Sequence, residues 1–429
     1  MMLVMRCLLL IAAMLPAFAQ QHWVATWGTA QQQYRAAGRG GAPATSAPAP
    51  PPAQPPAPAP GVPGRRFPVP RALPGVHNQT VRMIVRSSVG GKTLRVRLSN
   101  ALGAGTLTLG AAHIAIHAKG SAIVPASDRA LTFSGKPGAS IYAGQVLVSD
   151  PVSLDVASLT DLAVSLYLPG DTGPPTSHTF ALRPTYVSGE GDFTGRTEIP
   201  DPAATMESWY WLAGIDVLAA KDAFTLVTFG DSITDGDQSS LDSNHAWPSL
   251  LAARLQRNKS TAQIGVVNAG ISGNRVLGDN GGALARILRD VMSVPGVRWM
   301  TVLEGINDIT GATRPGAQPG SFTADSLIAA YRQIIDTAHL YGVKVAGCTM
   351  TPYAGASPYS EAGESIRQTV NQWIRTGRVF DAVIDFEAAT RDRATPPRFR
   401  PEADSPDLLH PGDAGYELMA NAINLSIFK

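Results

Sequence analysis

The stretch TLVTFGDSITDG, residues Thr225 to Gly236, decides the fold and lies just past the middle of the 429-residue chain. An apolar, strand-like run leads directly into Gly-Asp-Ser and then into Thr-Asp-Gly. Ser232 therefore stands where a strand is expected to give way to a helix. Two roles are open to it: an N-cap of that helix, or a nucleophile presented at the end of the strand.

Strand-like and helical patterns alternate from Lys221 to the C-terminus. The strand-like runs are FTLVTF, IGVVNAG, RWMTVLEG, KVAGCTM and AVIDF, and the helical patterns are SLLAARLQR, ALARILRDVMS, SLIAAYRQIIDTAHLYG, EAGESIRQTVNQWIRTG and AGYELMANAINLSIF. This alternation predicts a parallel sheet with helices on both faces and the C-terminal ends of all its strands at one edge. Ligands of such sheets bind at that edge. The residues that follow each strand are therefore the candidates for a site.

The preceding part of the chain follows a different pattern. Between Thr80 and Gly189, apolar residues recur with period two in short runs separated by Gly, Pro, Ser or Asp. Many short strands without helices predict an antiparallel β-sandwich. The runs TVRMIVRSS and KTLRVRLSN flank Val-Gly-Gly, which is a hairpin signal. The expected organisation is a β-sandwich domain over residues 20–220 and an α/β domain over residues 221–429.

Two further segments are expected to lie outside the folded cores. Residues 1–19 combine Arg6, a short apolar run and a small-x-small site, which predicts a secretory signal cleaved near Ala19/Gln20 and export to the periplasm or the medium. A membrane anchor is the alternative, but the apolar run is shorter than the span of about 20 residues that a bilayer requires. Residues 38–75 are dominated by Ala, Pro and Gly and are expected to form a polyproline-like insertion within the first domain.

The composition limits the classes of partner. A net charge of +2 over this length gives no electrostatic reason to expect nucleic acid or an anionic membrane. His113 and His117 share the face of a predicted strand, but no third ligand accompanies them, so no metal site is expected. Cys348 lies within an apolar run and is expected to be a buried hydrophobic residue. The oligomeric state is left open.

The predicted strand ends carry residues suited to acyl transfer. Ser232 needs a base to take its proton. Of the histidines in the α/β region, His339 falls inside a helical pattern and His245 precedes Ala-Trp-Pro, whereas His410 has Asp407 three residues before it. Asp407 can hold the imidazole tautomer that leaves the other ring nitrogen free for Ser232. His410 is therefore the expected base.

An oxyanion that develops in such a reaction needs hydrogen-bond donors, each worth about 3–4 kcal/mol in serine hydrolases. The backbone N–H groups of Ser232 and Gly273 and the side-chain amide of Asn307 are the candidates. Each residue also has a structural alternative: a cap for Ser232, a positive φ for Gly273, a turn for Asn307, and a helix-start ion pair for Asp407 with His410. Their common position at one sheet edge favours a catalytic site.

Five more residues beside these segments are candidates for the pocket: Asp231, Asp235, Asn274, Arg275 and Asp308. Asp231 is expected to brace the turn or the helix start, because a second carboxylate beside the nucleophile would oppose an oxyanion. Asp235, Arg275 and Asp308 are expected to organise the pocket, to contact a polar substrate, or to form solvated or structural ion pairs. Trp247, which precedes a proline, is expected to serve packing rather than as a sugar platform.

This set of residues resembles the GDSL-type, or SGNH, serine hydrolases, in which Ser, Gly, Asn and His come from four sequence blocks. The matching positions are Ser232 in GDSITDG, Gly273 in NAGISGN, Asn307 in GIND and His410 in DLLH, with Asp407 as the acid. The resemblance covers the chain from about residue 224 onward. It implies a flavodoxin-like α/β/α sandwich that hydrolyses esters through an acyl-enzyme, without metal or cofactor. The β-rich first domain looks like that of exported bacterial members, which include carbohydrate esterases.

The expected function is therefore that of a secreted serine esterase whose partner is an ester substrate. Short acyl groups on an acylated polysaccharide are the first candidate. A lipase or longer-chain acylhydrolase is the alternative among enzymes, because nothing in the sequence defines the length of an acyl pocket. An inactive glycan-binding protein is the alternative from another class.

Overall fold

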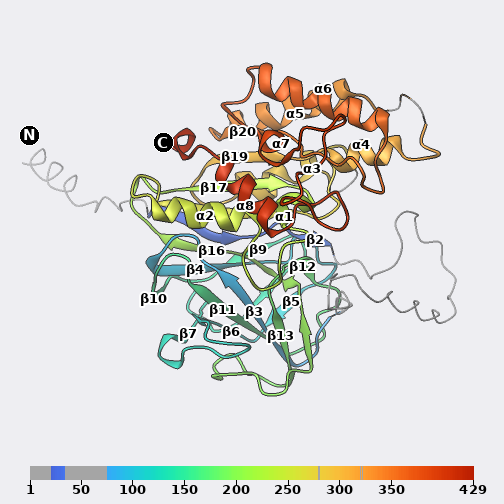
Figure 1. Cartoon of the computed structure of the whole chain (residues 1–429). Helices are drawn as coiled ribbons and strands as arrows, with labels where there is room; N and C mark the ends of the chain where they lie inside the picture. Colours follow the sequence, from blue (N-terminus) through green and yellow to red (C-terminus); the bar gives the residue numbers. More distant parts are fainter. Residues whose placement is uncertain (1–20, 34–74, 279–280, 319, 321) are drawn as a thin grey trace, which may run out of the picture.

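The computed structural model describes residues 21–33, 75–278, 281–318, 320 and 322–429. The expected signal segment, and all of the expected insertion except Gly75, lie outside the described residues. Figure 1 shows a β-rich domain packed against a second domain in which helices surround a sheet. None of the helices in the described ranges has the length and apolarity that crossing a membrane requires.

The first domain is an antiparallel β-sandwich. One sheet contains β1 (Trp23–Gly28), β16 (Leu212–Leu218), β4 (Gly91–Ser99) and β10 (Val152–Val156), with β9 (Val146–Val148) also paired to β4. The other contains β14 (Ala204–Met206), β13 (Thr185–Glu190), β3 (Gln79–Arg86), β11 (Asp161–Leu168), β6 (Ala111–Ile116) and β7 (Arg129–Ala130). Apolar side chains from both sheets, such as Val96 and Val164, belong to one buried core. The predicted sandwich is confirmed.

Smaller elements complete the first domain. They are the sheet of β15 (Trp209–Tyr210), β12 (Thr176–His178) and β2 (Gln32–Gln33), the pair β5 (Leu107–Leu109) and β8 (Ala139–Ile141), and the short helix η1 (Pro125–Ser127). The sheet that contains β12 carries His178 to the boundary with the second domain.

The predicted hairpin at Val-Gly-Gly is wrong. Strand β3 pairs with β11 and β13, whereas β4 pairs with β16, β10 and β9, so the chain crosses between the two sheets of the sandwich at this point. The glycines are needed for close packing instead of a tight hairpin turn. A Cβ at Gly90 would lie 2.5 Å from the carbonyl oxygen of Val156, and one at Gly91 would lie 2.8 Å from Cβ of Val217.

The second domain is a flavodoxin-like α/β/α sandwich, as expected. Its five parallel strands lie in the order β18 (Ile264–Gly270), β17 (Phe224–Gly230), β19 (Val297–Leu303), β20 (Lys344–Cys348) and β21 (Ala382–Ile384). One face is covered by α3 (Ala283–Ile287) with η2 (Leu288–Met292), α5 (Ala324–Leu340) and α6 (Glu361–Thr376). The other is covered by α2 (Trp247–Arg257), α7 (Phe386–Thr390), α8 (Asp413–Ala422) and η3 (Leu425–Phe428). The short helices α1 (Ser232–Asp235) and α4 (Ile306–Thr313) begin at the C-terminal edge of the sheet.

Cys348 is fully buried in the core beneath α2 and α8, as the sequence predicts for a small hydrophobic residue. Burial also raises the pKa of its thiol. Trp247 is fully buried as well and packs on Phe386 with ring centroids 5.2 Å apart, which confirms its expected role in packing.

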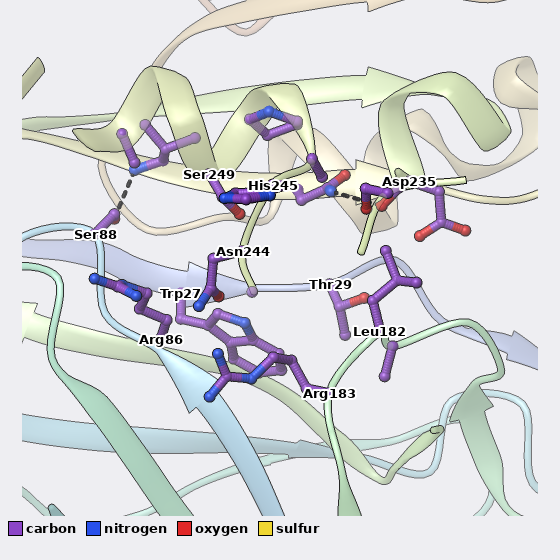
Figure 2. Close-up of a pocket in the computed structure, with 18 of the residues that line it drawn as sticks. Trp27, Thr29, Arg86, Ser88, Leu182, Arg183, Asp235, Asn244, His245 and Ser249 are labelled. Carbon is purple, nitrogen blue, oxygen red and sulfur yellow. Dashed lines mark hydrogen bonds between the residues drawn. The ribbon is translucent and has the colours of Figure 1, made fainter. Parts of the chain in front are cut away.

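The β-sandwich covers the edge strand of the parallel sheet. Thr29, just beyond β1, forms a parallel bridge to Asn268 of β18. The hydroxyl of Ser88 accepts a hydrogen bond of 2.8 Å from the backbone N–H of Val266 (Figure 2). An uncovered edge strand presents unpaired backbone groups that invite aggregation. The first domain therefore protects this edge of the α/β domain.

Gly265 gives a test of this contact. A Cβ at this position would lie 2.3 Å from the carbonyl oxygen of Ala25 in β1. This is a backbone atom, so relieving the clash would require the strand to shift. We expect Gly265→Ala to lower the free energy of unfolding by about 1–3 kcal/mol, as overpacking typically does. Denaturant-induced unfolding measures the change. The control is Gly105→Ala, since nothing lies within 4 Å of a Cβ there. Equal stability of the two variants would contradict the tight contact between the domains.

Candidate active site

Ser232 is the first residue of α1 and follows β17 by one intervening residue. The cap of this helix is Asp231, whose carboxylate accepts a hydrogen bond of 3.0 Å from the N–H of Ile233. The turn is tight, because a Cβ at Gly230 would lie 2.6 Å from the carbonyl oxygen of Leu303. Ser232 is thus not the cap, and its hydroxyl is available for another role. Asp231 therefore braces the start of the helix, as the sequence predicts.

The hydroxyl of Ser232 meets a histidine and a carboxylate from the loop before α8. Ser232 Oγ lies 2.7 Å from His410 Nε2, and His410 Nδ1 lies 2.6 Å from Asp407 Oδ2. The other carboxylate oxygen of Asp407 accepts hydrogen bonds of 2.9 Å from the backbone N–H groups of Leu409 and His410 and from the hydroxyl of Ser405. These bonds orient the carboxylate, which in turn orients the imidazole. The structure therefore brings together the three residues proposed as a triad.

The electrostatics of this group suit a base. Burial raises the pKa of Asp407, but hydrogen bonds from the side chain and backbone of His410 outweigh it and hold this pKa well below its ordinary value. Burial lowers the pKa of His410, yet its hydrogen bond to Asp407 and the charges of Asp237, Asp407 and Asp231 raise it above the ordinary 6.5. Asp407 is therefore an anion at neutral pH, and His410 is a stronger base than a free imidazole.

The three expected oxyanion donors come from neighbouring strand ends. Gly273 lies in the loop after β18 with φ of 77°, a conformation that favours glycine. Asn307, in the first turn of α4, donates one amide hydrogen to the carbonyl oxygen of Asn274 at 2.9 Å, which leaves its second N–H free. The described residues provide no acceptor for the N–H groups of Ser232 and Gly273. The three candidate donors thus follow β17, β18 and β19, and the loop before α8 brings His410 to Ser232 at the first of these strand ends.

Arg286 supports this edge from beneath, and the sequence analysis did not find it. Its guanidinium donates to the carbonyl oxygens of Gly230 and Ala269 at 2.9 and 2.8 Å, to the side-chain oxygen of Asn274 at 2.8 Å, and to Glu304 at 3.2 Å. These groups belong to or follow three adjacent strands. A signal was present in the pattern: the buried positions of α3 and η2 include 283, 286, 287 and 291, so an arginine occupies the core-facing stripe.

Buried carboxyl groups lie around this cation: Glu304 and Asp290 pair with it at 3.2 and 3.3 Å, and its charge also acts on Asp231. Burial raises the pKa of Asp231 to about 7 and that of Glu304 well above its ordinary value, and Arg286 opposes both shifts. Burial also raises the pKa of Asp308, although the N–H groups of Leu277 and Val276 oppose it. The positive charge of Arg286 therefore lowers the cost of ionising carboxyl groups that would otherwise repel one another.

The flanking candidates organise the site. Asp308 accepts hydrogen bonds from the N–H groups of Val276 and Leu277 at 2.8 and 2.9 Å, which fastens the loop after Gly273 to α4. The side-chain oxygen of Asn274 accepts a hydrogen bond from Arg286, and its amide nitrogen donates one to the carbonyl oxygen of Gly281. Arg275 is exposed, and its guanidinium lies against Gly311 of α4.

Asp235 is buried in an ion pair with His178 of the β-sandwich, with 2.9 Å between Asp235 Oδ1 and His178 Nε2. Of the two pocket roles weighed for it, substrate contact and a structural ion pair, the structure shows the second. His178 itself carried no signal in the sequence.

The other histidines are engaged elsewhere. His245 pairs with Asp413 at 3.0 Å and His339 with Asp381 at 2.8 Å, so neither reaches Ser232. His113 pairs with Asp128 at 3.0 Å, and His117 bonds the carbonyl oxygen of Gly120. No group of three or more His, Cys, Asp or Glu side chains suited to a metal ion occurs within the described part of the chain.

The pKa of His410 can be tested through the reactivity of Ser232. The neutral imidazole is the form that accepts a proton, so the labelling rate of Ser232 by a fluorophosphonate should rise with pH, with a midpoint above 6.5. Removing the charge of Asp407 with Asp407→Asn should move this midpoint to lower pH and slow the labelling. Asp381→Asn, which alters the separate His339 pair, is the control and should leave the midpoint unchanged. A midpoint that stays in place or rises in Asp407→Asn would contradict this electrostatic assignment.

Known proteins resemble part of this chain. Residues 228–418 match the model of the GDSL-like lipase/acylhydrolase family. A comparison with curated proteins found no match. Similar solved structures include a GDSL-like lipase from Bacteroides thetaiotaomicron, with 19% identity over 49% of this chain and 90% of that chain and a TM-score of 0.38. Another is a catalytic mutant of an acetylxylan esterase from Geobacillus stearothermophilus, with 23% identity over 48% of this chain and 96% of that chain and a TM-score of 0.37. Residues 228–418, within the α/β domain, thus form the part of the chain that matches the GDSL-like lipase/acylhydrolase family.

Proposed function

We propose that this chain is an exported serine esterase that hydrolyses carboxylic esters through an acyl-enzyme. The observation that carries the proposal is the pair of short contacts from Ser232 to His410 and from His410 to Asp407, 2.7 and 2.6 Å. A serine hydroxyl is a weak nucleophile, and an oriented imidazole is the group that activates it.

In the first half of the reaction, Ser232 Oγ attacks the ester carbonyl carbon while His410 Nε2 takes the hydroxyl proton. The negative charge on the former carbonyl oxygen is held by the N–H groups of Ser232 and Gly273 and by the free N–H of Asn307. The tetrahedral intermediate then expels the alkoxide, which receives the proton from His410. The products of this half are the free alcohol and an ester on Ser232.

In the second half, water attacks the acyl carbon of that ester and His410 takes a proton from the water. The second tetrahedral intermediate uses the same oxyanion donors, and its collapse returns the proton to Ser232 Oγ. The carboxylic acid leaves and the enzyme is regenerated. Asp407 stays ionised throughout and stabilises the imidazolium in both halves.

For the substrate, we propose short acyl groups, acetyl first, on carbohydrate. Support comes from the resemblance of the two-domain chain to exported carbohydrate esterases and from an apolar cluster beside the base. This cluster contains Ile306, Tyr353 and Ala356, with Leu408 and Leu409 packed against it, so the residues directly before Asn307 and His410 belong to or pack on an apolar cluster. An apolar surface of this kind suits an uncharged acyl group.

The proposed nucleophile is tested by Ser232→Ala. We expect this variant to lose hydrolysis of a short-chain aryl ester by at least about 10⁴-fold, since the nucleophile acts with its base as a unit. The wild-type protein should label with a fluorophosphonate at Ser232, and the variant should not. Ser158→Ala, a change at an exposed serine in a turn of the β-sandwich, is the control. Hydrolysis that persists in purified Ser232→Ala would remove the basis of the proposal.

The proposed acyl preference requires a substrate series. We expect kcat/KM to be highest for acetate and to fall with chain length in aryl esters, and acetate to be released from acetylated xylan. A maximum at eight or more carbons, without release from xylan, would favour a longer-chain acylhydrolase. Binding of glycan by a protein that never labels at Ser232 would favour a binding protein.

Asn307 is the side-chain donor whose removal leaves the triad in place. Asn307→Ala should lower kcat by about 10²–10³-fold, the usual cost of one oxyanion donor, while KM changes little. The pH midpoint of activity should stay where it is, because His410 and Asp407 are untouched. Asn424→Ala, which removes the exposed cap of η3, is a matched control. A kcat for Asn307→Ala within a factor of two of the wild type would exclude its role as a donor.

A further inference from the structure

Asp235 links the nucleophile helix to the other domain. It is the last residue of α1, three positions after Ser232, and its side chain is buried. Figure 2 shows it at the wall of a partly open cavity between the domains, near Thr29 and Leu182. One carboxylate oxygen accepts from His178 Nε2 at 2.9 Å. The other accepts from the backbone N–H and the hydroxyl of Ser272 at 2.9 and 2.8 Å.

His178 is held so that it carries a positive charge. Its Nδ1 lies 2.8 Å from the carbonyl oxygen of Ala30, and its Nε2 lies 3.1 Å from that of Phe180 and 2.9 Å from Asp235 Oδ1. All three partners are acceptors, so both ring nitrogens must carry hydrogen. The ring also stacks on Trp209 with centroids 5.6 Å apart. Burial lowers the pKa of His178, but the charge and hydrogen bond of Asp235, together with the carbonyl oxygens of Ala30 and Phe180, raise it by more.

Ser272 connects Asp235 to Gly273, whose N–H is one of the proposed oxyanion donors. It directly precedes Gly273, so the peptide group that carries the Gly273 N–H begins at Ser272. The two hydrogen bonds to Asp235 hold both the backbone N–H and the side chain of Ser272, which fixes its φ and χ1. Gly273 has no atom within 4 Å of a Cβ position and is exposed. The direction of its N–H therefore depends on the residue before it more than on contacts of its own.

From these contacts we infer that His178, a residue of the β-sandwich, is a positioning residue for ester hydrolysis that acts through Asp235 and Ser272 on the Gly273 N–H. The inference rests on the proposed function. It makes the first domain part of the machinery that stabilises the transition state, although His178 itself touches no substrate. Loss of the imidazolium leaves Asp235 buried without its partner and free to turn away from Ser272.

The test is a kinetic comparison of His178→Gln, Ser272→Ala and the double variant in the full-length protein. Active sites are counted by fluorophosphonate titration, so that any unfolded fraction drops out. We expect each single change to lower kcat per active site by about tenfold, less than outright removal of a donor, with KM within a factor of two. Binding of a boronic acid, which forms a tetrahedral adduct on Ser232, should weaken by a similar factor.

The double variant separates positioning from general destabilisation. Because both changes break one chain of contacts, their combined effect on kcat should equal the larger single effect instead of the product of the two. The matched control is His113→Gln, which alters another histidine–carboxylate pair of the β-sandwich, 3.0 Å long and partly buried. It should leave kcat per active site unchanged.

Several results would overturn the inference. One is a kcat per active site within a factor of two of the wild type in both single variants. Another is a loss of kcat in His113→Gln equal to that in His178→Gln. The third is a loss of kcat in the double variant equal to the product of the two single losses. If His178→Gln fails to fold, Ser272→Ala decides alone, because it removes one hydrogen bond and leaves the buried ion pair intact. An inactive wild-type protein, or an active Ser232→Ala variant, would instead refute the proposed function.

Discussion

The buried guanidinium of Arg286 is the interaction on which the rest of the site depends. It bonds a carbonyl oxygen at the end of β17, another at the end of β18, and the carboxylate of Glu304 just after β19. Its carbon lies 4.0 Å from the centroid of the Phe229 ring. Parallel strands end with carbonyl groups that no neighbour satisfies, and removing the partner of a buried charge costs about 3–5 kcal/mol. A single cation thus sets the spacing of the three strand ends from which Ser232, Gly273 and Asn307 extend.

Much of this arrangement could be predicted from the sequence because it depends on local patterns. Alternating strands and helices imply a parallel sheet, and such a sheet has one edge where its carboxyl ends meet. Gly273, Asn307 and His410 could therefore be assigned to the same edge as Ser232 without knowledge of any distance. The pairing of Asp407 with His410 is local as well, since three residues separate them.

The parts that could not be predicted depend on contacts between distant segments. His178 and Asp235 are 57 residues apart and belong to different domains, so no periodicity connects them. The glycines at 90 and 91 carry the same signal as a hairpin turn, yet they are required by close approach to β10 and β16. Arg286 had a visible signal, a cation on a core-facing stripe, but its acceptors are backbone carbonyls that have no signature in the amino-acid sequence.

The bond between Ser232 and His410 spans 178 residues of chain, whereas the turn that braces Ser232 closes over two. Contacts of such long range form late, after the loop-closure entropy of the intervening chain has been overcome. A molecule with an intact first turn of α1 but an undocked C-terminal loop would have an ordinary, unreactive serine. For the proposed esterase, the rate of turnover would therefore measure how many molecules have brought the C-terminal loop to Ser232. It would fall on partial unfolding before spectroscopic measures of secondary structure change.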